Sequence, residues 1–116
     1  MSYAIWSLVS NLYLNPIFTI SSYWKHITLK TAIIASTSTI HGSAYLEYLT
    51  QELEIHFKEA NVITFIPYAR PGGISHDDYT TIATKAFKKI NKKVKGLHEF
   101  NEPAKALLHA EGIFTG

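Results

Sequence analysis

The sequence predicts an α/β protein of three layers, in which helices cover both faces of a parallel sheet. Short apolar runs alternate with amphipathic segments along residues 30–116. One apolar run leads directly into a Pro/Gly-rich loop and a helix start, in "VITFIPYARPGGISHDDYT". The predicted order is strand, helix, strand, helix, strand, helix, strand, and this alternation is typical of right-handed crossovers between parallel strands.

The composition supports one small globular domain. The chain has 116 residues, of which 47% are apolar and 17% charged, so it can bury a core. A net charge of +2 gives no reason to expect nucleic acid or an acidic membrane as a partner. There is no cysteine, which excludes disulfides and cysteine-ligated metals and fits a reducing compartment. We therefore expect a cytoplasmic protein.

Residues 1–29 differ from the rest. Between Met1 and Thr28 only Lys25 carries a formal side-chain charge, and Ser, Asn and Pro16 interrupt the apolar run. The segment is just long enough for a membrane span, but it lacks the basic start of a secretory signal. We expect an atypical apolar extension outside the fold, with the α/β domain over residues 30–116.

The first predicted strand is "TAIIA", Thr31 to Ala35, a short apolar run of the kind found in buried parallel strands. The hydroxyl-rich loop 36–43 follows it. A helix is predicted over residues 44–60, because apolar residues recur there at helical spacing: Tyr45, Leu49, Leu53 and Phe57.

The second strand is predicted at Val62 to Ile66 and ends at Pro67, which cannot donate to a sheet ladder. The Pro71-Gly72-Gly73 run predicts a turn. Ser75 with Asp78 forms a capping pattern for the next helix. The apolar side of that helix is predicted to carry Tyr79, Ile82, Ala83, Ala86, Phe87 and Ile90.

The final elements are a third strand at Val94 to His98 and a short helix behind Pro103, which suits a first helical turn. Gly112 ends this helix, and "IFT" begins a fourth strand. An unpaired edge there would favour aggregation.

Ligands of such folds gather at the carboxyl ends of the strands, which here are the loops at 36–43 and 67–75. The hydroxyls of loop 36–43, followed by His41, could cradle a phosphate or flavin, or could serve only as turn residues. Arg70 is the only arginine and could pair with a substrate carboxylate, although a solvent-exposed role fits equally well.

Other candidate chemistry has simpler explanations. The histidines are scattered without spaced partners, so no metal site is predicted. Asp77 and Asp78 could act as acid and base, but helix capping accounts for them. The lysines between Lys85 and Lys95 fit a solvated helix face better than a nucleic-acid surface. No G-x-S-x-G elbow is present, so no assembled catalytic site is predicted.

Residues 30–116 resemble the amino-terminal part of the aspartyl dipeptidase family, also called dipeptidase E or peptidase E, whose members are serine peptidases. The matching segments are "IIASTSTIHGSAYLEYL", "VITFIPYA" leading to "HDDYT", and "VKGLHEFNEPAKALLHAEGIFTG". Gly116 resembles the first glycine of the Gly-Gly-Gly-Asn-Thr motif that follows the last strand in the family.

The resemblance implies a fold similar to class I glutamine amidotransferase domains, of which about half is present. It implies hydrolysis of dipeptides with an amino-terminal aspartate by a Ser-His-acid triad, without a cofactor. The family's nucleophile lies beyond the position of Gly116, so no catalytic residue is carried over and the chain alone is expected to be inactive. The residues expected to line the substrate cleft are Ser36, Thr37, Ser38, His41, Arg70 and Gly116.

Family members begin near the position of Leu29, and our hypothesis is that Leu29 marks the true start, read from an alternative initiation codon. Three other interpretations stay open. One is a flavodoxin-like module that binds FMN, and another is a cyanophycinase-like peptidase of the same superfamily. The third is a membrane-anchored or structural fragment that depends on residues 1–28.

Overall fold

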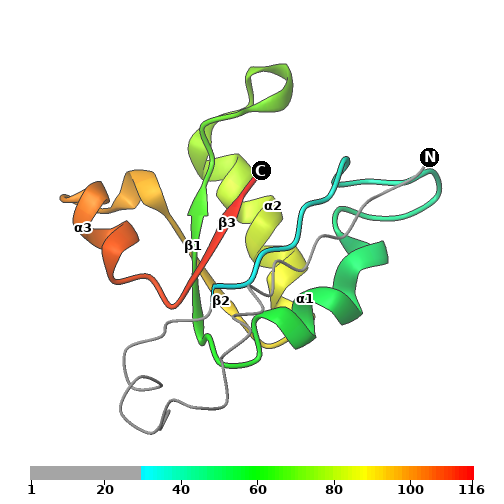
Figure 1. Ribbon diagram of the computed structural model, residues 1–116. Coiled ribbons are helices and arrows are strands. Elements are labelled where there is room, and N and C mark those ends of the chain that lie inside the picture. The colour runs from blue at the N-terminus through cyan, green and yellow to red at the C-terminus, as the bar shows by residue number, and fades with distance from the viewer. Residues whose placement is uncertain (1–29) are drawn as a thin grey trace, which may run out of the picture. The chain divides into compact units, whose positions relative to one another are not determined.

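The computed structural model describes residues 30–116, drawn in colour in Figure 1. The chain divides into two compact units, residues 1–36 and 37–116, and the second contains the helices and strands that follow. The predicted extension at 1–29 and the hypothesis about Leu29 lie outside the described residues.

Three parallel strands form the sheet, in the order β2-β1-β3. They are β1 (Val62–Ile66), β2 (Lys93–Gly96) and β3 (Gly112–Thr115). The central position of β1 agrees with its apolar sequence. Its three middle residues are buried, and only Thr64 among them is polar. The register places Thr64 opposite Lys95 on one side and Ile113 on the other.

The predicted strand at Thr31–Ala35 is wrong for the described structure. These residues have neither strand nor helix conformation, and Ile34 is 56% exposed. A strand forms only where a neighbour accepts its backbone hydrogen bonds. No described strand pairs with this run: β1 has β2 and β3 as its neighbours, and β2 and β3 each pair only with β1 among the described strands. In the described structure this apolar run is mostly exposed and belongs to none of the strands of the sheet.

The predicted helix at 44–60 is shorter than expected. A 3₁₀ turn, η2 (Glu47–Leu49), precedes α1 (Thr50–His56). The helix cannot extend further towards the amino terminus, because Leu46 has a left-handed backbone with φ of 56°. The predicted apolar side is confirmed for Leu49, Leu53 and Phe57, which are all buried.

The second strand and second helix are confirmed. After β1, Pro67 ends the strand and the Pro71–Gly73 segment makes a 3₁₀ turn, η3, in which Gly72 has φ of 63°. The next helix is α2 (His76–Lys88). The Ser75 hydroxyl accepts the Asp78 N–H at 3.0 Å, as the capping pattern predicts.

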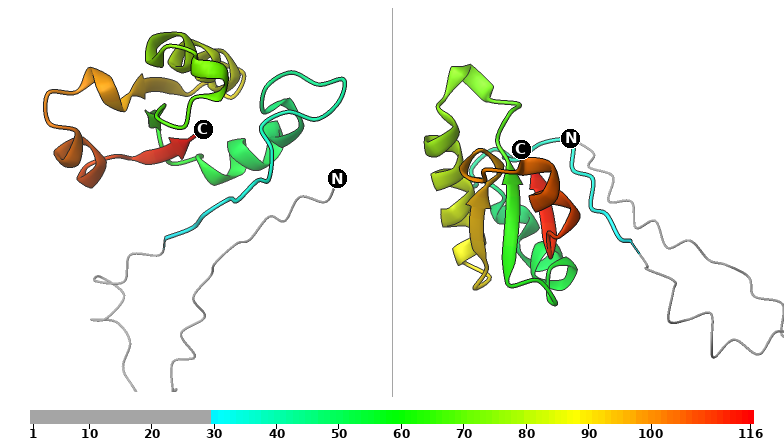
Figure 2. Two further views of the ribbon diagram at one scale, coloured as in Figure 1. Left: turned by 90° about the horizontal axis from the view of Figure 1, so that it is seen from above. Right: turned by 90° about the vertical axis from the view of Figure 1, so that its left-hand side faces the viewer.

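The last elements also follow the predicted order. β2 ends at Gly96, two residues earlier than predicted, because Leu97–Glu99 turns into a 3₁₀ segment, η4. The short helix is α3 (Pro103–Leu108), with Pro103 in its first turn. Figure 2 shows α1 and α2 on one face of the sheet and α3 on the other, so the unit of residues 37–116 has the predicted three-layer α/β arrangement. In the described part of the chain, no helix is long and apolar enough to cross a membrane.

The core lies between the sheet and α2. Phe65 of β1 is fully buried and contacts the rings of Tyr79 and Phe114, with centroids 5.1 and 5.5 Å away. Phe87, also buried, links Phe114 to Phe57 of the turn after α1. The Phe65–Phe114 rings are stacked and the other pairs are edge-to-face, and both kinds of aromatic contact add to the free energy of simple burial. This cluster fixes β1, β3, α1 and α2 relative to one another.

Candidate functional site

The candidate site is the edge of the sheet at which the three parallel strands end. Because the strands are parallel, the loop after β1, the η4 segment after β2 and Gly116 after β3 all begin at this edge (Figure 1). The side chains of this edge therefore come from segments that are far apart in the sequence.

The hydroxyl-rich loop is folded mainly by its own hydrogen bonds. The Thr37 hydroxyl donates to the Thr39 carbonyl at 2.9 Å, and the Thr37 carbonyl accepts the Tyr48 hydroxyl. The Ser38 carbonyl accepts the Leu46 N–H at 2.7 Å. These contacts are turn chemistry, the simpler of the two interpretations of this loop.

Arg70 also closes its own loop. Its guanidinium donates to the Ile74 carbonyl at 3.0 Å, and the residue is exposed. A guanidinium has five N–H donors, so this bond leaves most of its capacity for a carboxylate. The loop fixes the position of Arg70 without neutralising it.

Gly116 lies against the aromatic core at the end of β3. A Cβ atom there would contact the Tyr79 hydroxyl and would lie 2.8 Å from Tyr79 Cζ and 3.1 Å from Phe65. Only glycine fits at this distance without a shift of the tyrosine ring. The Gly116 N–H donates a hydrogen bond to the Ile66 carbonyl at 3.5 Å, so the backbone is still hydrogen-bonded to β1 at this residue.

Tyr45 places a second phenol beside Tyr79, with ring centroids 6.2 Å apart. The Tyr45 hydroxyl is buried beside the Tyr79 phenol. Burial raises the pKa of Tyr45, and the neighbouring Tyr79 phenol raises it further. Tyr45 is therefore a neutral phenol at physiological pH, packed against the cluster of Phe65, Tyr79 and Ala83.

A cluster of titratable residues joins the β1 and β2 ends of the edge. His98 of η4 and Asp77 of α2 form a hydrogen bond of 2.7 Å between Nε2 and Oδ1. The His76 ring lies 5.3 Å from the His98 ring and 5.3 Å from the Tyr68 ring. This histidine cluster, Tyr68, His76, Asp77 and His98, fastens η4 to the first turn of α2.

The His98–Asp77 pair has the geometry of a base and its orienting carboxylate, but the ring is turned the wrong way for catalysis on a ligand. Asp77 contacts Nε2, and the remaining nitrogen, Nδ1, is buried and has no hydrogen-bond partner among residues 30–116. A Cβ added at Gly96 would lie 2.6 Å from that nitrogen, which shows that Nδ1 faces the backbone of β2. A general base must reach the proton that it removes, and Nδ1 does not face the solvent.

The structure does not join the sequence-predicted cleft residues into one cluster. Ser36 belongs to the other unit, where it is exposed. In the second unit, His41 is exposed, and no described contact connects it, Arg70 and Gly116. Their role in lining a cleft stays a prediction, as does that of Thr37 and Ser38. Among the described residues no group of three His, Asp or Glu side chains could hold a metal ion.

Sequence reasoning missed the histidine cluster, since it treated the histidines as scattered. The available signal was topological: His76 and His98 both follow the carboxyl end of a strand, and β1 and β2 are neighbours. Asp77 lies in the first turn of α2 as predicted, but its carboxylate pairs with His98 in addition to any effect on the helix terminus.

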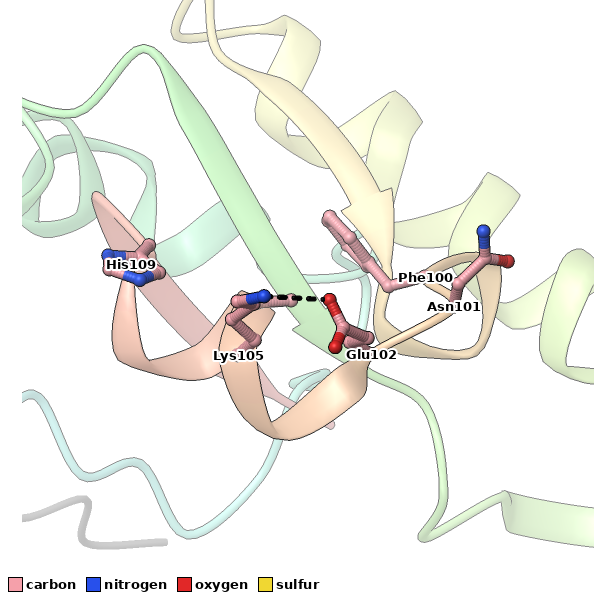
Figure 3. A pocket seen from close by; sticks show the side chains of 6 residues that line it. Phe100, Asn101, Glu102, Lys105 and His109 are labelled. Atoms are coloured by element: carbon pink, nitrogen blue, oxygen red, sulfur yellow. Dashed lines mark hydrogen bonds and ion pairs between the residues drawn. The ribbon is translucent and has the colours of Figure 1, made fainter.

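A separate pocket of about 320 Å³ is lined by residues between Phe100 and His109, around α3, and Figure 3 shows its lining. Within it, Lys105 and Glu102 form an ion pair of 3.0 Å with both side chains mostly exposed. Such exposed pairs contribute little. The pocket contains none of the predicted cleft residues, so it does not extend the candidate site.

The fold is a three-layer α/β arrangement in which the loops of one edge follow the ends of parallel strands. Comparison with known sequences is more specific. Residues 32–116 match the sequence profile of Peptidase family S51, and the chain belongs to this family.

Three similar proteins carry names of dipeptidases or peptidases. The chain is 38% identical over 89 residues to a "Probable alpha-aspartyl dipeptidase" of Drosophila melanogaster, covering 75% of this chain and 36% of that protein. It is 32% identical to a "Peptidase E" of Shewanella amazonensis, covering 73% and 36%, and 31% identical to a "Peptidase E" of Streptomyces coelicolor, covering 72% and 33%. The match thus spans about a third of the length of these relatives.

Proposed function

We propose that this chain is part of a peptidase that hydrolyses dipeptides with an amino-terminal aspartate. The observation that carries the proposal is the match to Peptidase family S51 over 32–116, which covers all three strands and the edge at which they end. The name of the Drosophila melanogaster relative, at 38% identity, supports the substrate class.

The proposed mechanism uses a serine nucleophile, a histidine base and an acidic partner, with backbone amides that stabilise the acyl-transfer oxyanion. We infer that these groups lie outside the 116 residues, because no nucleophile elbow is present and His98 is turned into the fold. The described edge supplies Arg70, with N–H donors free for a carboxylate, and the fixed backbone at Gly116. A peptide substrate and a cytoplasmic site of action are part of the proposal.

A chimera tests this function. Residues 30–116 would replace the matching segment of the Streptomyces coelicolor relative, so that the rest of that protein supplies the remaining groups. We expect the chimera to hydrolyse Asp-Leu, and the 116-residue chain alone to give no turnover above buffer, because transition-state stabilisation requires the nucleophile and base together.

Two controls make the result specific. Leu-Asp in place of Asp-Leu should be cleaved much more slowly by the chimera, and the relative itself sets the reference rate. A chimera with the relative's circular dichroism spectrum but no activity on Asp-Leu would contradict the proposal. Hydrolysis of Asp-Leu by the 116-residue chain alone would contradict the placement of the catalytic groups.

A further inference from the structure

The histidine cluster connects three segments of the candidate-site edge: η4, the start of α2 and the loop after β1. His98 Nε2 and Asp77 Oδ1 are 2.7 Å apart. His76 is the first residue of α2, and its ring lies 5.3 Å from the rings of both His98 and Tyr68. Among residues 30–116, no other hydrogen bond or ion pair joins η4 to α2. The cluster is therefore the polar connection between the end of β2 and the first turn of α2.

The neutral His98 ring fits this arrangement in one tautomer. An ionised carboxylate only accepts hydrogen bonds, so the proton is on Nε2, which donates to Asp77, and Nδ1 carries a lone pair. Nδ1 is buried and faces Gly96, where an added Cβ atom would lie 2.6 Å from it. A second proton would create an N–H at Nδ1, for which residues 30–116 provide no acceptor. Burying a donor without an acceptor is unfavourable.

Acid also charges His76, which lies at the wrong end of its helix for a cation. The amino terminus of a helix carries a partial positive charge, so a protonated His76 at the start of α2 would oppose it. Two protonated rings 5.3 Å apart would also repel each other. Imidazoles take up a proton between about pH 8 and 5. Acid therefore adds both charges in the same pH range.

The carboxylates of the cluster and its neighbours offset these effects only in part. Asp77 favours a charged His98, but the Asp77 side chain is 88% exposed, so water screens its charge. Asp78 accepts the Ser75 hydroxyl at 2.6 Å. In η4 itself, Glu99 accepts a backbone N–H of β2 at 2.6 Å.

The other elements packed against the cluster add no free negative charge. β1 has no titratable side chain, and the lysines of α2 near its end are in the last turn, away from His76. Lys105 of α3 is paired with Glu102 at 3.0 Å. The loop after β1 contributes the Tyr68 phenol and the positive charge of Arg70.

We propose that the histidine cluster is a pH-sensitive latch that holds η4 and the loop 67–75 at the start of α2 and opens in acid. With both rings neutral, His98 donates to Asp77 and the latch is closed. With both rings protonated, His98 turns towards water, which its side chain, 18% exposed, reaches without opening the core. His76 then moves away from His98, and the ring of Tyr68 loses its neighbour.

Opening of the latch loosens one side of the candidate-site edge. The loop that carries Arg70 and the η4 segment both begin at this edge. The latch itself does not depend on the proposed function. Its consequence for peptide hydrolysis, through the position of Arg70, rests on that function.

Hydrogen exchange of the 116-residue chain between about pH 7.5 and 5.0 tests the latch, in a range above the titration of ordinary carboxyl groups. The reporters are the amides of Asp78 and Tyr79, each bonded to Ser75 at 3.0 Å, and the reference is the amide of Ile63 in β1. After correction for the intrinsic pH dependence of exchange, protection should fall about tenfold towards pH 5 at the reporters and less than about twofold at the reference. Reporter protection that stays constant or rises towards pH 5 would overturn the proposal.

Two substitutions should change this acid effect in opposite directions. His76→Gln removes one of the two charges, so the fall in protection should be smaller than in the wild type. Asp77→Asn keeps an oxygen that accepts from His98 Nε2 but removes the negative charge that favours the protonated ring, so the fall should be larger. His109→Gln, at an exposed position after α3, is the matched control and should behave as the wild type.

Circular dichroism at pH 7.5 establishes that each variant is folded, and the wild-type measurement decides the question if one is not. An acid effect that His76→Gln leaves unchanged, or that Asp77→Asn reduces, would overturn the proposal. The second result would mean that His98 and Asp77 form an ion pair that tightens in acid.

Asp-Leu turnover by the chimera is recorded separately over the same pH range, and its KM should rise towards pH 5 less in His76→Gln than without this substitution. A latch that opens in the 116-residue chain, together with an inactive chimera, would refute the proposed function and leave the latch intact. An active chimera, together with pH-independent protection at Asp78 and Tyr79, would refute the latch and leave the function intact.

Discussion

The two faces of the sheet are packed very differently. On the α1 and α2 face, four aromatic rings pack together, those of Phe57, Phe65, Phe87 and Phe114. Helix α2 contributes buried Ala83 and Phe87 to this face. On the opposite face, α3 has no buried residue. Among the described residues, the α1 and α2 face therefore holds the aromatic core, and α3 covers the other face less completely.

Helix length explains part of this contrast. α2 has 13 residues and a side-chain cap, whereas α3 has six residues and no side-chain cap. Isolated helices shorter than about 12–15 residues are marginal in water, so a six-residue helix depends on packing for its stability. Without buried residues, α3 has little of that packing.

The largest effect is expected from Phe87→Ala, which removes the ring that links Phe57 to Phe114. Phe87 is 1% exposed, so the substitution leaves a cavity in the closed face and should lower the free energy of unfolding by about 3–5 kcal/mol. The matched control on the open face is Leu108→Ala, at 82% exposure, with an expected change within about 0.5 kcal/mol.

Urea unfolding followed by circular dichroism measures both variants. If Leu108→Ala were as destabilising as Phe87→Ala, the open face would be as well packed as the closed one, and the comparison would fail.

A smaller, pH-dependent effect is expected where the strands begin. Glu111 precedes β3, and its carboxylate accepts the N–H groups of Asn61 and Val62 at 2.5 and 3.2 Å, which ties the start of β3 to the start of β1. These two hydrogen bonds lower the pKa of Glu111 below its ordinary value of 4.5. Because the folded state holds this proton less tightly than the unfolded state, Glu111 stabilises the fold above its ordinary pKa, and the stabilisation is lost as the pH falls through the lowered folded value.

The variant Glu111→Gln should therefore be less stable than the wild type at neutral pH, and the difference should shrink in acid, below the ordinary pKa of a glutamate. Thermal unfolding of both proteins between neutral pH and about pH 3 measures it. Glu59→Gln, at an exposed position with only a long ion pair to Lys58, is the control and should show little change. A pH-independent difference for Glu111→Gln would show that the two N–H bonds are not the cause.

Much of the closed face could be predicted from the sequence. The Ser75 cap and the apolar spacing from Tyr79 to Phe87 locate α2, and "VITFI" followed by Pro67 locates β1, because these signals are local and agree with one another. The run Thr31–Ala35 has an equally clear strand composition, but it is not a strand in the described structure. Strand formation depends on a neighbour, and a neighbour is not a local property of the sequence.

The candidate site was less predictable for a related reason. The loop 67–75 follows the carboxyl end of β1 as predicted, whereas the loop 36–43 follows no described strand. The pairing of His98 with Asp77, 21 residues apart, depends on the β1–β2 register and on side-chain orientation, and the contact of Gly116 with Tyr79 depends on β3 lying beside β1. Neither the register nor the rotamer follows from local spacing alone.

Hydrogen exchange of the 116-residue chain by itself tests the difference between the two faces most directly. Amides in β1 and in the Ala83–Phe87 part of α2 should exchange slowest, through global unfolding, whereas the amides of Leu107 and Leu108 in α3 should open with a free energy far below that value. Equal protection of α3 and α2 would contradict the account, because it would mean that both faces of the sheet are already closed.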